Sequence, residues 1–499
     1  MVYQTKYDVA VVGAGPAGLH AAYSLLKAGK SVVIIEARKR VGGRTWNGRV
    51  RDEEGNDRFI EIGGQWISPD QTRLSDLVAE LGLETYQRYR KGKSVYISPD
   101  GTRHTYDGNC LPCGNETNAE IEKLIGLLDD LAARVRVEAP WDSEDAKKLD
   151  TIPFRDWLQQ HSTNQEAIDN ISIYMASGML TKPSYSFSAL QAALMAASAG
   201  SFSNLVDEDF ILDRRVIGGM QSVSLRLAEK IEELGGKIVL DAPVRRIKWA
   251  ETDPETADEL NGVAADLRNG VDYDGAPGAM EINTDKHSFS VKNAVLAVPP
   301  NLYHRIQYDP PMPREQMVAH QHISMGLVIK VHAVYETPFW RDKGLSGTCF
   351  GGGRLVQELY DNTNVQYGAG GAAVEDEVGT LVGFISDEFA EKMWRLPAEK
   401  RRETILEAIS EYLGPEALRP IAFYLSDMAA EEWTRGAYAT SYDLGGLHRW
   451  GAIQNQPTGP IYYACSDIAA EGYQHVDGAV RQGELVAHKI IEAQDKIAG

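Results

Sequence analysis

Residues 7–45 read YDVAVVGAGPAGLHAAYSLLKAGKSVVIIEARKRVGGRT, and this stretch decides the fold. An apolar strand leads into a glycine-rich turn, an amphipathic helix follows, and a second apolar strand ends at Glu36. Gly13, Gly15 and Gly18 have the G-x-G-x-x-G spacing. The first glycine permits a tight turn, the second lets the backbone approach a pyrophosphate, and the third lets helix and strand pack closely. The stretch therefore predicts a βαβ unit that binds a dinucleotide.

The residues after this unit favour FAD over NAD as the dinucleotide. Glu36 ends the second strand, where a carboxylate accepts hydrogen bonds from ribose hydroxyls and repels a 2′-phosphate. RVGGRT, residues 40–45, then adds a glycine pair and two arginines, which suit the buried pyrophosphate of an extended FAD. EIGGQWI, residues 61–67, supplies another glycine pair where backbone could approach a flat ring. A nicotinamide domain needs neither addition.

Further α/β segments are expected to join the first βαβ unit. They begin at Arg215 (RVIGGMQSV onward), at Asn293 (NAVLAVPP) and at GPIYYACSD, which leads into a helix near Asp477. Residues 251–286 are acidic and rich in Asp, Gly and Ala, so they predict an exposed insertion. The predicted division is a discontinuous FAD-binding domain at 1–85, 215–298 and 430–499 and a substrate-binding domain at 86–214 and 299–429.

Composition limits the class of protein. A chain of 499 residues with a formal net charge of −20 does not carry the basic footprint that nucleic-acid binding requires. No apolar run reaches the roughly 20 residues of a membrane span, and no signal segment precedes the first strand. The four cysteines are too few for a disulfide scaffold and are typical of a reducing compartment. The Cys110–Cys113 pair, without a second pair or a nearby His, favours ordinary thiols over a metal site. We expect a soluble cytoplasmic protein without a metal.

Several segments in order along nearly the whole chain resemble the flavin-containing amine oxidases. They are GAGPAG, EARKRVGGRT, EIGGQW, APV, VIKVHAVYETPFW, RGAYATSY and SDIAAEGYQHVDGAV. Others resemble most closely the bacterial members that oxidise the diamine putrescine: LTKPSYSFSALQA, SFSNLVDEDFILDRRVIGGMQ, LVQELYDNTN and EEWTRGAYATSYDLGGLHR. The resemblance implies an α/β amine oxidase fold, with a Rossmann-like FAD-binding domain of the GR2 type and a discontinuous α+β substrate-binding domain. It also implies a homodimer.

The resemblance assigns FAD contacts residue by residue. The backbone of Val244 is expected to meet the adenine, and Ser466 and Asp467 are expected near the ribityl chain and pyrophosphate. Ala437 takes the position of the cysteine that carries the flavin in covalently flavinylated relatives. Because alanine has no nucleophile, the flavin is expected to be held non-covalently. The complete set of expected contacts is Gly13, Gly15, Gly18, Glu36, Arg38, Gly43, Arg44, Gln65, Val244, Ala437, Ser466, Asp467 and Val476.

Three residues are expected to be catalytic by the same resemblance. Lys330 matches the lysine that holds a water against flavin N5, and its place inside an apolar strand independently favours a role, since an unpaired ammonium is costly there. Tyr438 matches one wall of an aromatic cage through which the amine reaches the flavin. His475 takes the place of the second cage tyrosine, and Tyr473 is the alternative if the register slips by two.

A diamine substrate needs an anchor for the nitrogen that is not oxidised. Glu358 matches the acidic residue that resembling enzymes place at the far end of the pocket, and Asp361 is a weaker candidate. The implied reaction moves a hydride from the carbon next to the neutral amine to flavin N5. The imine is hydrolysed to 4-aminobutanal, which cyclises to 1-pyrroline, and ammonia is released. Dioxygen reoxidises the flavin and gives hydrogen peroxide. Activity should rise towards alkaline pH, since the reacting amine must be neutral.

Other functions remain open on the sequence. Cadaverine or spermidine could be preferred, because pocket depth sets chain length. An L-amino-acid oxidase would need a cation for the substrate carboxylate, and Arg435 lies close in sequence to Tyr438. A non-catalytic flavoprotein scaffold and a nicotinamide-dependent dehydrogenase are the remaining alternatives.

Overall fold

The computed structural model describes residues 5–249, 280–368 and 370–498. The chain forms two compact units, each assembled from separate segments of the sequence. Unit 1 comprises residues 1–43, 223–324 and 446–499, and unit 2 comprises residues 44–222 and 325–445. Among the described helices, none is both long enough and apolar enough to cross a membrane.

Unit 1 is built on an eight-stranded sheet, counted over the described residues, in the order β10-β2-β1-β13-β12-β11-β14, with β24 also paired to β13. The pairs β10–β2, β2–β1, β1–β13, β13–β24 and β11–β14 are parallel, whereas β12 runs antiparallel to both of its neighbours. The strands are β1 (Thr5–Val12), β2 (Val32–Ile35), β10 (Lys237–Val239), β11 (Val244–Lys248), β12 (Met280–Thr284), β13 (Ser288–Leu296), β14 (Gln307–Asp309) and β24 (Ile461–Tyr463).

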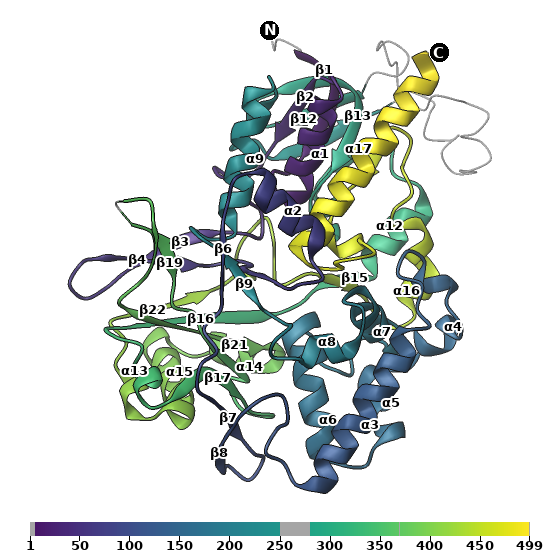
Figure 1. Ribbon diagram of the computed structural model, residues 1–499. Coiled ribbons are helices and arrows are strands. Elements are labelled where there is room, and N and C mark those ends of the chain that lie inside the picture. Colours follow the sequence, from purple (N-terminus) through teal and green to yellow (C-terminus); the bar gives the residue numbers. More distant parts are fainter. Residues whose placement is uncertain (1–4, 250–279, 369, 499) are drawn as a thin grey trace. The chain divides into compact units, whose positions relative to one another are not determined.

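Two helices from opposite ends of the chain pack together in unit 1, α1 (Pro16–Lys27) and α17 (Val476–Ala498) (Figure 1). Small residues make the close approach possible: a Cβ on Gly483 of α17 would lie 2.4 Å from the carbonyl oxygen of Ala17. The other helical segments are most of α9 (Gln221–Glu233), η3 (Pro300–Arg305), α12 (Arg314–Gln321), α16 (Gly446–Trp450), η5 (Gly451–Ile453) and η6 (Ser466–Ile468).

Unit 2 contains a seven-stranded sheet in the order β22-β16-β21-β18-β17-β7-β8. Its central strands β16 and β21 are buried along their whole length, which is why they read as nearly continuous apolar runs. The strands are β7 (Lys93–Ile97), β8 (Arg103–Tyr106), β16 (Val328–Tyr335), β17 (Leu345–Phe350), β18 (Glu358–Asp361), β21 (Gly379–Ser386) and β22 (Ala422–Ser426).

Smaller sheets and a group of helices complete unit 2. β5 (Trp66–Ile67) and β6 (Thr85–Gln87) both pair with β9 (Arg214–Val216), β3 (Asn47–Arg51) pairs with β4 (Asp57–Glu61), and β19 (Val365–Tyr367) pairs with β20 (Ala373–Glu375). β23 (Thr440–Tyr442) is a further short strand of this unit, and of the short strand β15 (Ile323–Met325) only Met325 belongs to it. The helices are α2 (Thr72–Glu80), α3 (Asn115–Ala132), η1 (Pro140–Asp142), α4 (Ala146–Leu149), α5 (Phe154–His161), α6 (Gln165–Ser172), the π-helix η2 (Ile173–Leu180), α7 (Ala189–Ser198), α8 (Phe202–Val206), α13 (Phe339–Asp342), α14 (Asp387–Trp394), α15 (Ala398–Leu413) and η4 (Pro415–Leu418).

The compact units differ from the predicted domain boundaries in four places. Residues 215–222 and 430–445 were expected with the FAD-binding domain, but they pack in unit 2. Residues 44–85 were expected with the FAD-binding domain, but they pack in unit 2, because β5 and β6 pair with β9 and β3 pairs with β4. Residues 299–324 were expected with the substrate-binding domain, but they pack in unit 1, where β14 pairs with β11. The functional domains themselves stay a prediction.

The predicted acidic insertion at 251–286 lies largely outside the described residues, since 250–279 are not described. For its last part the expectation of an exposed segment is wrong. Met280–Thr284 forms β12, which lies between β11 and β13 in the unit 1 sheet. Met280 and Ile282 are buried in the core of that unit, because alternate residues of the strand face the same side.

Candidate functional site

The glycine-rich turn of unit 1 has the geometry that its spacing predicts. Gly13 adopts a φ of +106°, which favours glycine, between β1 and α1. A Cβ on Gly18 would lie 2.1 Å from the carbonyl oxygen of Gly13, so any larger residue would push the helix away from the turn. The third glycine therefore serves close packing of helix on strand, as expected.

Two backbone segments approach each other over this turn without side chains between them. A Cβ on Gly43 would lie 3.2 Å from the Cα of Gly15, and the backbone N–H of Gly42 donates to Ala14 O at 2.8 Å. Gly15 is the N-cap of α1 and provides no side-chain cap, and Pro16 follows at the first helical position. The N–H groups of the first turn are thus available to an anion, which the positive end of the helix dipole favours. These residues fit the pyrophosphate of a dinucleotide.

Glu36 follows directly after β2 and points back at the turn. Its carboxylate is buried and accepts hydrogen bonds from the backbone N–H of Ala14 at 2.7 Å and of Arg38 at 2.8 Å. The Arg38 guanidinium lies 3.6 Å from the same carboxylate. These contacts fix Glu36 at the strand end where a carboxylate meets a ribose. The structure therefore brings Glu36, Arg38, Gly13 and Gly15 to one edge of the unit 1 sheet.

The remaining predicted residues of unit 1 lie at, or directly before, the starts of other elements. Val244 is the first residue of β11, and Ser466 and Asp467 form most of η6. The Asp467 carboxylate accepts a hydrogen bond from the Cys465 thiol at 2.8 Å. His475 and Val476 stand at the beginning of α17, where the His475 ring Nδ1 lies 2.8 Å from the carbonyl oxygen of Tyr473.

Lys330 occupies the middle of the buried strand β16 in unit 2. Its side chain is 6% exposed, and its Nζ donates to the carbonyl oxygens of Glu61 at 2.6 Å and Gly63 at 2.7 Å. A third hydrogen bond goes to Oε1 of Gln65, so the structure brings these two predicted residues together. Burial lowers the pKa of Lys330 to about 7; the Glu61 carboxylate opposes this shift and the Arg215 guanidinium adds to it. Burial thus disfavours the charged form of Lys330, whereas the three oxygen acceptors fix the position of its Nζ.

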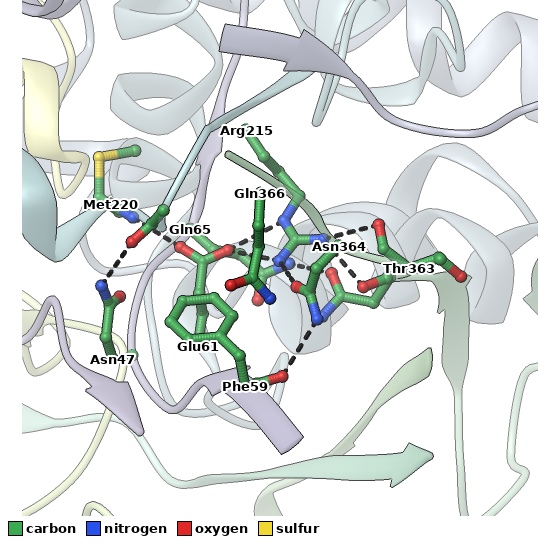
Figure 2. Close-up of polar contacts among 12 residues, drawn as sticks. Asn47, Phe59, Glu61, Gln65, Arg215, Met220, Thr363, Asn364 and Gln366 are labelled. Atoms are coloured by element: carbon green, nitrogen blue, oxygen red, sulfur yellow. Dashed lines mark hydrogen bonds and ion pairs between the residues drawn. The ribbon is translucent and has the colours of Figure 1, made fainter. Parts of the chain in front are cut away.

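A buried ion pair lies behind these acceptors, and sequence reasoning missed it (Figure 2). Arg215 donates from Nε and Nη2 to Oε2 of Glu61 at 2.9 and 2.6 Å, and both side chains are almost completely buried. The backbone N–H of Met220 donates to the other Glu61 oxygen at 2.6 Å. Glu61 was visible in the sequence as a charge within the apolar run FIEIGG, which is the signal that identified Lys330.

Glu358 is a further buried ionisable residue of unit 2, at the start of β18. Its carboxylate accepts a hydrogen bond from the Tyr360 hydroxyl at 3.1 Å, and burial raises its pKa to about 7 although this hydrogen bond lowers it. A Cβ on Gly178 of the π-helix would lie 2.8 Å from Oε1 of Glu358. Asp361, the weaker candidate, instead accepts hydrogen bonds from Trp340 Nε1 and Arg341 Nε at 2.8 and 2.7 Å. Asp361 is therefore held as a structural ion pair.

A cluster of aromatic rings in unit 2 includes Tyr360, which donates the hydrogen bond to Glu358. The Tyr438 ring lies 5.8 Å from the ring of Phe384, and Trp66 lies 5.9 Å from Phe384 and 5.8 Å from Tyr360, measured between centroids. Burial, and after it the Glu358 carboxylate, raises the pKa of Tyr438 well above its usual value, so these two side chains interact. The cluster can exclude water from an amine while its faces attract a cation.

The backbone at Tyr438 is held by side chains that sequence reasoning only partly anticipated. The Thr181 hydroxyl donates to Ala437 O at 2.7 Å and accepts from the Tyr438 N–H at 3.0 Å. Arg44, predicted as a cofactor contact, donates to Tyr438 O at 2.9 Å. Arg435 is exposed and does not join this cluster. Tyr438 belongs to unit 2 and His475 to unit 1, so the aromatic cage that would pair them stays a prediction.

Comparison with known proteins assigns the family. Residues 16–491 match the model of the flavin containing amine oxidoreductases. The chain therefore belongs to this family, and its cofactor is FAD. It is 59% identical to the putrescine oxidase of Kocuria rosea over 97% of this chain and 95% of that protein. It is 28% identical to the flavin-containing amine oxidase B of Homo sapiens over 99% of this chain and 87% of that one.

Solved structures agree with this assignment. A wild-type putrescine oxidase bound to putrescine matches with a TM-score of 0.88 at 54% identity, covering 98% of this chain and 100% of that one. The cyclohexylamine oxidase from Brevibacterium oxydans matches with a TM-score of 0.84 at 26% identity, covering 98% and 99% of the two chains. The α/β amine oxidase fold expected from the sequence is thus confirmed.

The flavin should be released by acid, because Ala437 offers no nucleophile to bind it covalently. We expect trichloroacetic acid precipitation to leave a white pellet and a yellow supernatant whose spectrum is that of FAD. A pellet that keeps the flavin absorbance after washing would contradict non-covalent binding.

Proposed function

We propose that this amine oxidase acts on putrescine, converting it with dioxygen and water into 4-aminobutanal, ammonia and hydrogen peroxide. The observation that carries the proposal is the environment of Glu358. Its carboxylate is buried among aromatic rings, and within the described residues no cationic side chain forms an ion pair with it. A buried carboxylate needs a charge partner, and the second ammonium of a diamine supplies one. The similarity to putrescine oxidase of Kocuria rosea supports this choice.

In this proposal each end of the substrate meets a different part of the chain. Glu358 binds the ammonium that does not react, and the ring of Tyr438 orients the neutral amine and excludes water. Bound FAD supplies the acceptor for the hydride that leaves the carbon next to that amine. Lys330, whose pKa burial lowers to about 7, holds or releases a proton at Nζ close to the reacting centre.

We also propose that the protein is a cytoplasmic homodimer. The free state of all four cysteines supports a reducing compartment. The resemblance to the amine oxidases supports the homodimer. Cadaverine and spermidine are the competing substrates, because both carry a second cation for Glu358. An L-amino acid is less suited, since the side chain of Arg435 is exposed.

Replacing the anchor should separate diamines from monoamines. Glu358→Gln should raise the KM for putrescine by about 100-fold or more, because loss of one partner from a buried ion pair costs roughly 3–5 kcal/mol. An apolar monoamine such as hexylamine should be affected less than about threefold, since it places no charge at this position. Steady-state peroxide assays with both amines make the comparison. Equal losses for both would show that Glu358 is structural.

The same carboxyl should give putrescine binding a characteristic pH dependence. Because its pKa is raised to about 7, Glu358 is increasingly protonated below that pH and can no longer pair with an ammonium. The KM for putrescine should therefore rise by up to about tenfold per pH unit below pH 7, beyond the change seen for hexylamine. In Glu358→Gln this extra dependence should vanish. If the ratio of the KM for putrescine to the KM for hexylamine did not change between pH 5.5 and 8 in the wild-type enzyme, Glu358 would not be the anchor.

Gly178 should control access to the anchor. In Gly178→Ala the new Cβ would lie 2.8 Å from Oε1 of Glu358. The Glu358 carboxylate must then move away, which weakens its contact with the substrate ammonium. We expect the KM for putrescine to rise about tenfold, with hexylamine nearly unchanged, since a displacement of about 1 Å costs up to 100-fold. Gly126→Ala in α3 is the control, because nothing lies within 4 Å of a Cβ there. If Gly178→Ala lowered turnover of both amines equally, Gly178 would be a packing residue only.

A further inference from the structure

We propose that the Glu61–Arg215 ion pair positions Lys330 for amine oxidation, through two chains of contacts that both end at the lysine Nζ. The inference rests on the role proposed above for Lys330. Both members of the pair are positioning residues, since their side chains act through other groups.

The first chain of contacts runs through Glu61 itself. Its carboxylate is fixed from two sides, by the Arg215 guanidinium at 2.6 Å and by the backbone N–H of Met220 at 2.6 Å. The carbonyl oxygen of the same residue accepts the hydrogen bond from Lys330 Nζ at 2.6 Å. Glu61 is the last residue of β4, where it pairs with Asn47 of β3, and the next restraint on the backbone is the hydrogen bond from the Gly63 N–H to the carbonyl oxygen of Trp46 at 3.2 Å. The ion pair therefore adds a side-chain restraint to the backbone that carries this carbonyl, at the end of the strand.

The second chain of contacts runs through two amide side chains. Arg215 Nη1 donates to the backbone carbonyl of Asn362 at 2.9 Å. Oδ1 of Asn362 accepts from Nε2 of Gln65, and Oε1 of Gln65 accepts from Lys330. Because an amide donates only from nitrogen and accepts only at oxygen, this sequence allows one orientation of Gln65. Arg215 thereby helps to set the amide that faces Lys330.

The remaining contacts of Arg215 keep it from moving. Nη2 donates to Oδ1 of Asn364 at 2.7 Å, and Asn364 in turn donates to the carbonyl oxygen of Phe59 at 3.0 Å (Figure 2). The guanidinium also lies 5.4 Å from the centroid of the Tyr86 ring. A buried ion pair seldom adds net stability over a well-packed apolar pair, so stability alone does not account for this arrangement.

Few charges other than this pair act on Lys330. On its own strand, His332 is buried and its pKa is far below the usual value because of burial, so it is neutral. The neighbouring strands place Phe384 of β21 and Ser426 of β22 opposite Lys330, and neither is charged. The Trp66 ring lies 5.7 Å from Nζ. Glu61 and Arg215 are thus the charged side chains that act on the protonation of Lys330 among the described residues.

The test compares two variants of the pair with a matched control. Glu61→Gln removes a charge. Arg215→Lys keeps the charge but loses the guanidinium fork that reaches both Glu61 and Asn362. Arg341→Lys is the control, because Arg341 also pairs with a buried carboxylate, that of Asp361 at 2.7 Å, in the same unit, although Arg341 itself is only partly buried. The holoenzymes carry lysine labelled with ¹³C at Cε, and Lys330→Met identifies the Lys330 signal. NMR titration gives the pKa of Lys330 without any substrate, so this readout stands even if putrescine is the wrong amine.

We expect Glu61→Gln to lower the pKa of Lys330 by about one unit, because a nearby carboxylate favours the ammonium form. We expect Arg215→Lys to slow anaerobic flavin reduction by the best amine substrate about tenfold, with little change in amine affinity. Arg341→Lys should change neither the pKa of Lys330 nor the rate of flavin reduction. An unchanged Lys330 pKa in Glu61→Gln, or a reduction rate in Arg215→Lys equal to that of Arg341→Lys, would overturn the proposal. If Glu61→Gln does not fold, the comparison of the two Arg→Lys variants decides alone, since both conserve charge.

Discussion

The burial of the Lys330 amine inside a fully buried strand is the constraint on which unit 2 depends. Such a group is stable only when its hydrogen bonds are made, and three oxygen acceptors meet it. All three belong to the short segment 61–65, which follows a strand and contains a glycine pair. The segment is held by the Glu61–Arg215 ion pair together with the pairing of Glu61 with Asn47 in β3 and the backbone hydrogen bonds of Gly63 and Gly64. Polar contacts therefore contribute to the centre of this unit in addition to apolar packing.

Lys330 and Glu358 are both buried in unit 2, but the protein satisfies their hydrogen bonds to different extents. This difference indicates different roles. Lys330 has its donors satisfied by the protein. Glu358 receives one hydrogen bond from Tyr360, and its pKa is raised because burial disfavours the charged form. The ionised form of such a carboxylate is stabilised when a cation binds next to it. The contrast supports Lys330 as a group placed for chemistry and Glu358 as a group that binds the substrate.

The sequence predicts the parts of the molecule that depend on local spacing. Glycine positions and apolar periodicity predict the βαβ unit, and a charge in an apolar strand identifies Lys330. The same reasoning applied to FIEIGG would have found Glu61, and strand alternation would have separated Glu358 from Asp361. Arg215 gave no such signal, because it lies among charges in LDRRV. Gly178 could not be found either, since its approach to Glu358 depends on the register of a π-helix. The boundaries of the compact units could not be predicted, because strand pairing between distant segments leaves no local pattern.

The most direct measurement is the rate of flavin bleaching in an anaerobic stopped-flow experiment with putrescine, cadaverine, spermidine and hexylamine side by side. The account predicts that putrescine reduces the flavin fastest and that hexylamine is much slower at low concentration. If none of the four amines bleached the flavin, the fold and cofactor would stand but the proposed diamine oxidation would be wrong. If hexylamine were as effective as putrescine at every concentration, the anchor at Glu358 would be contradicted.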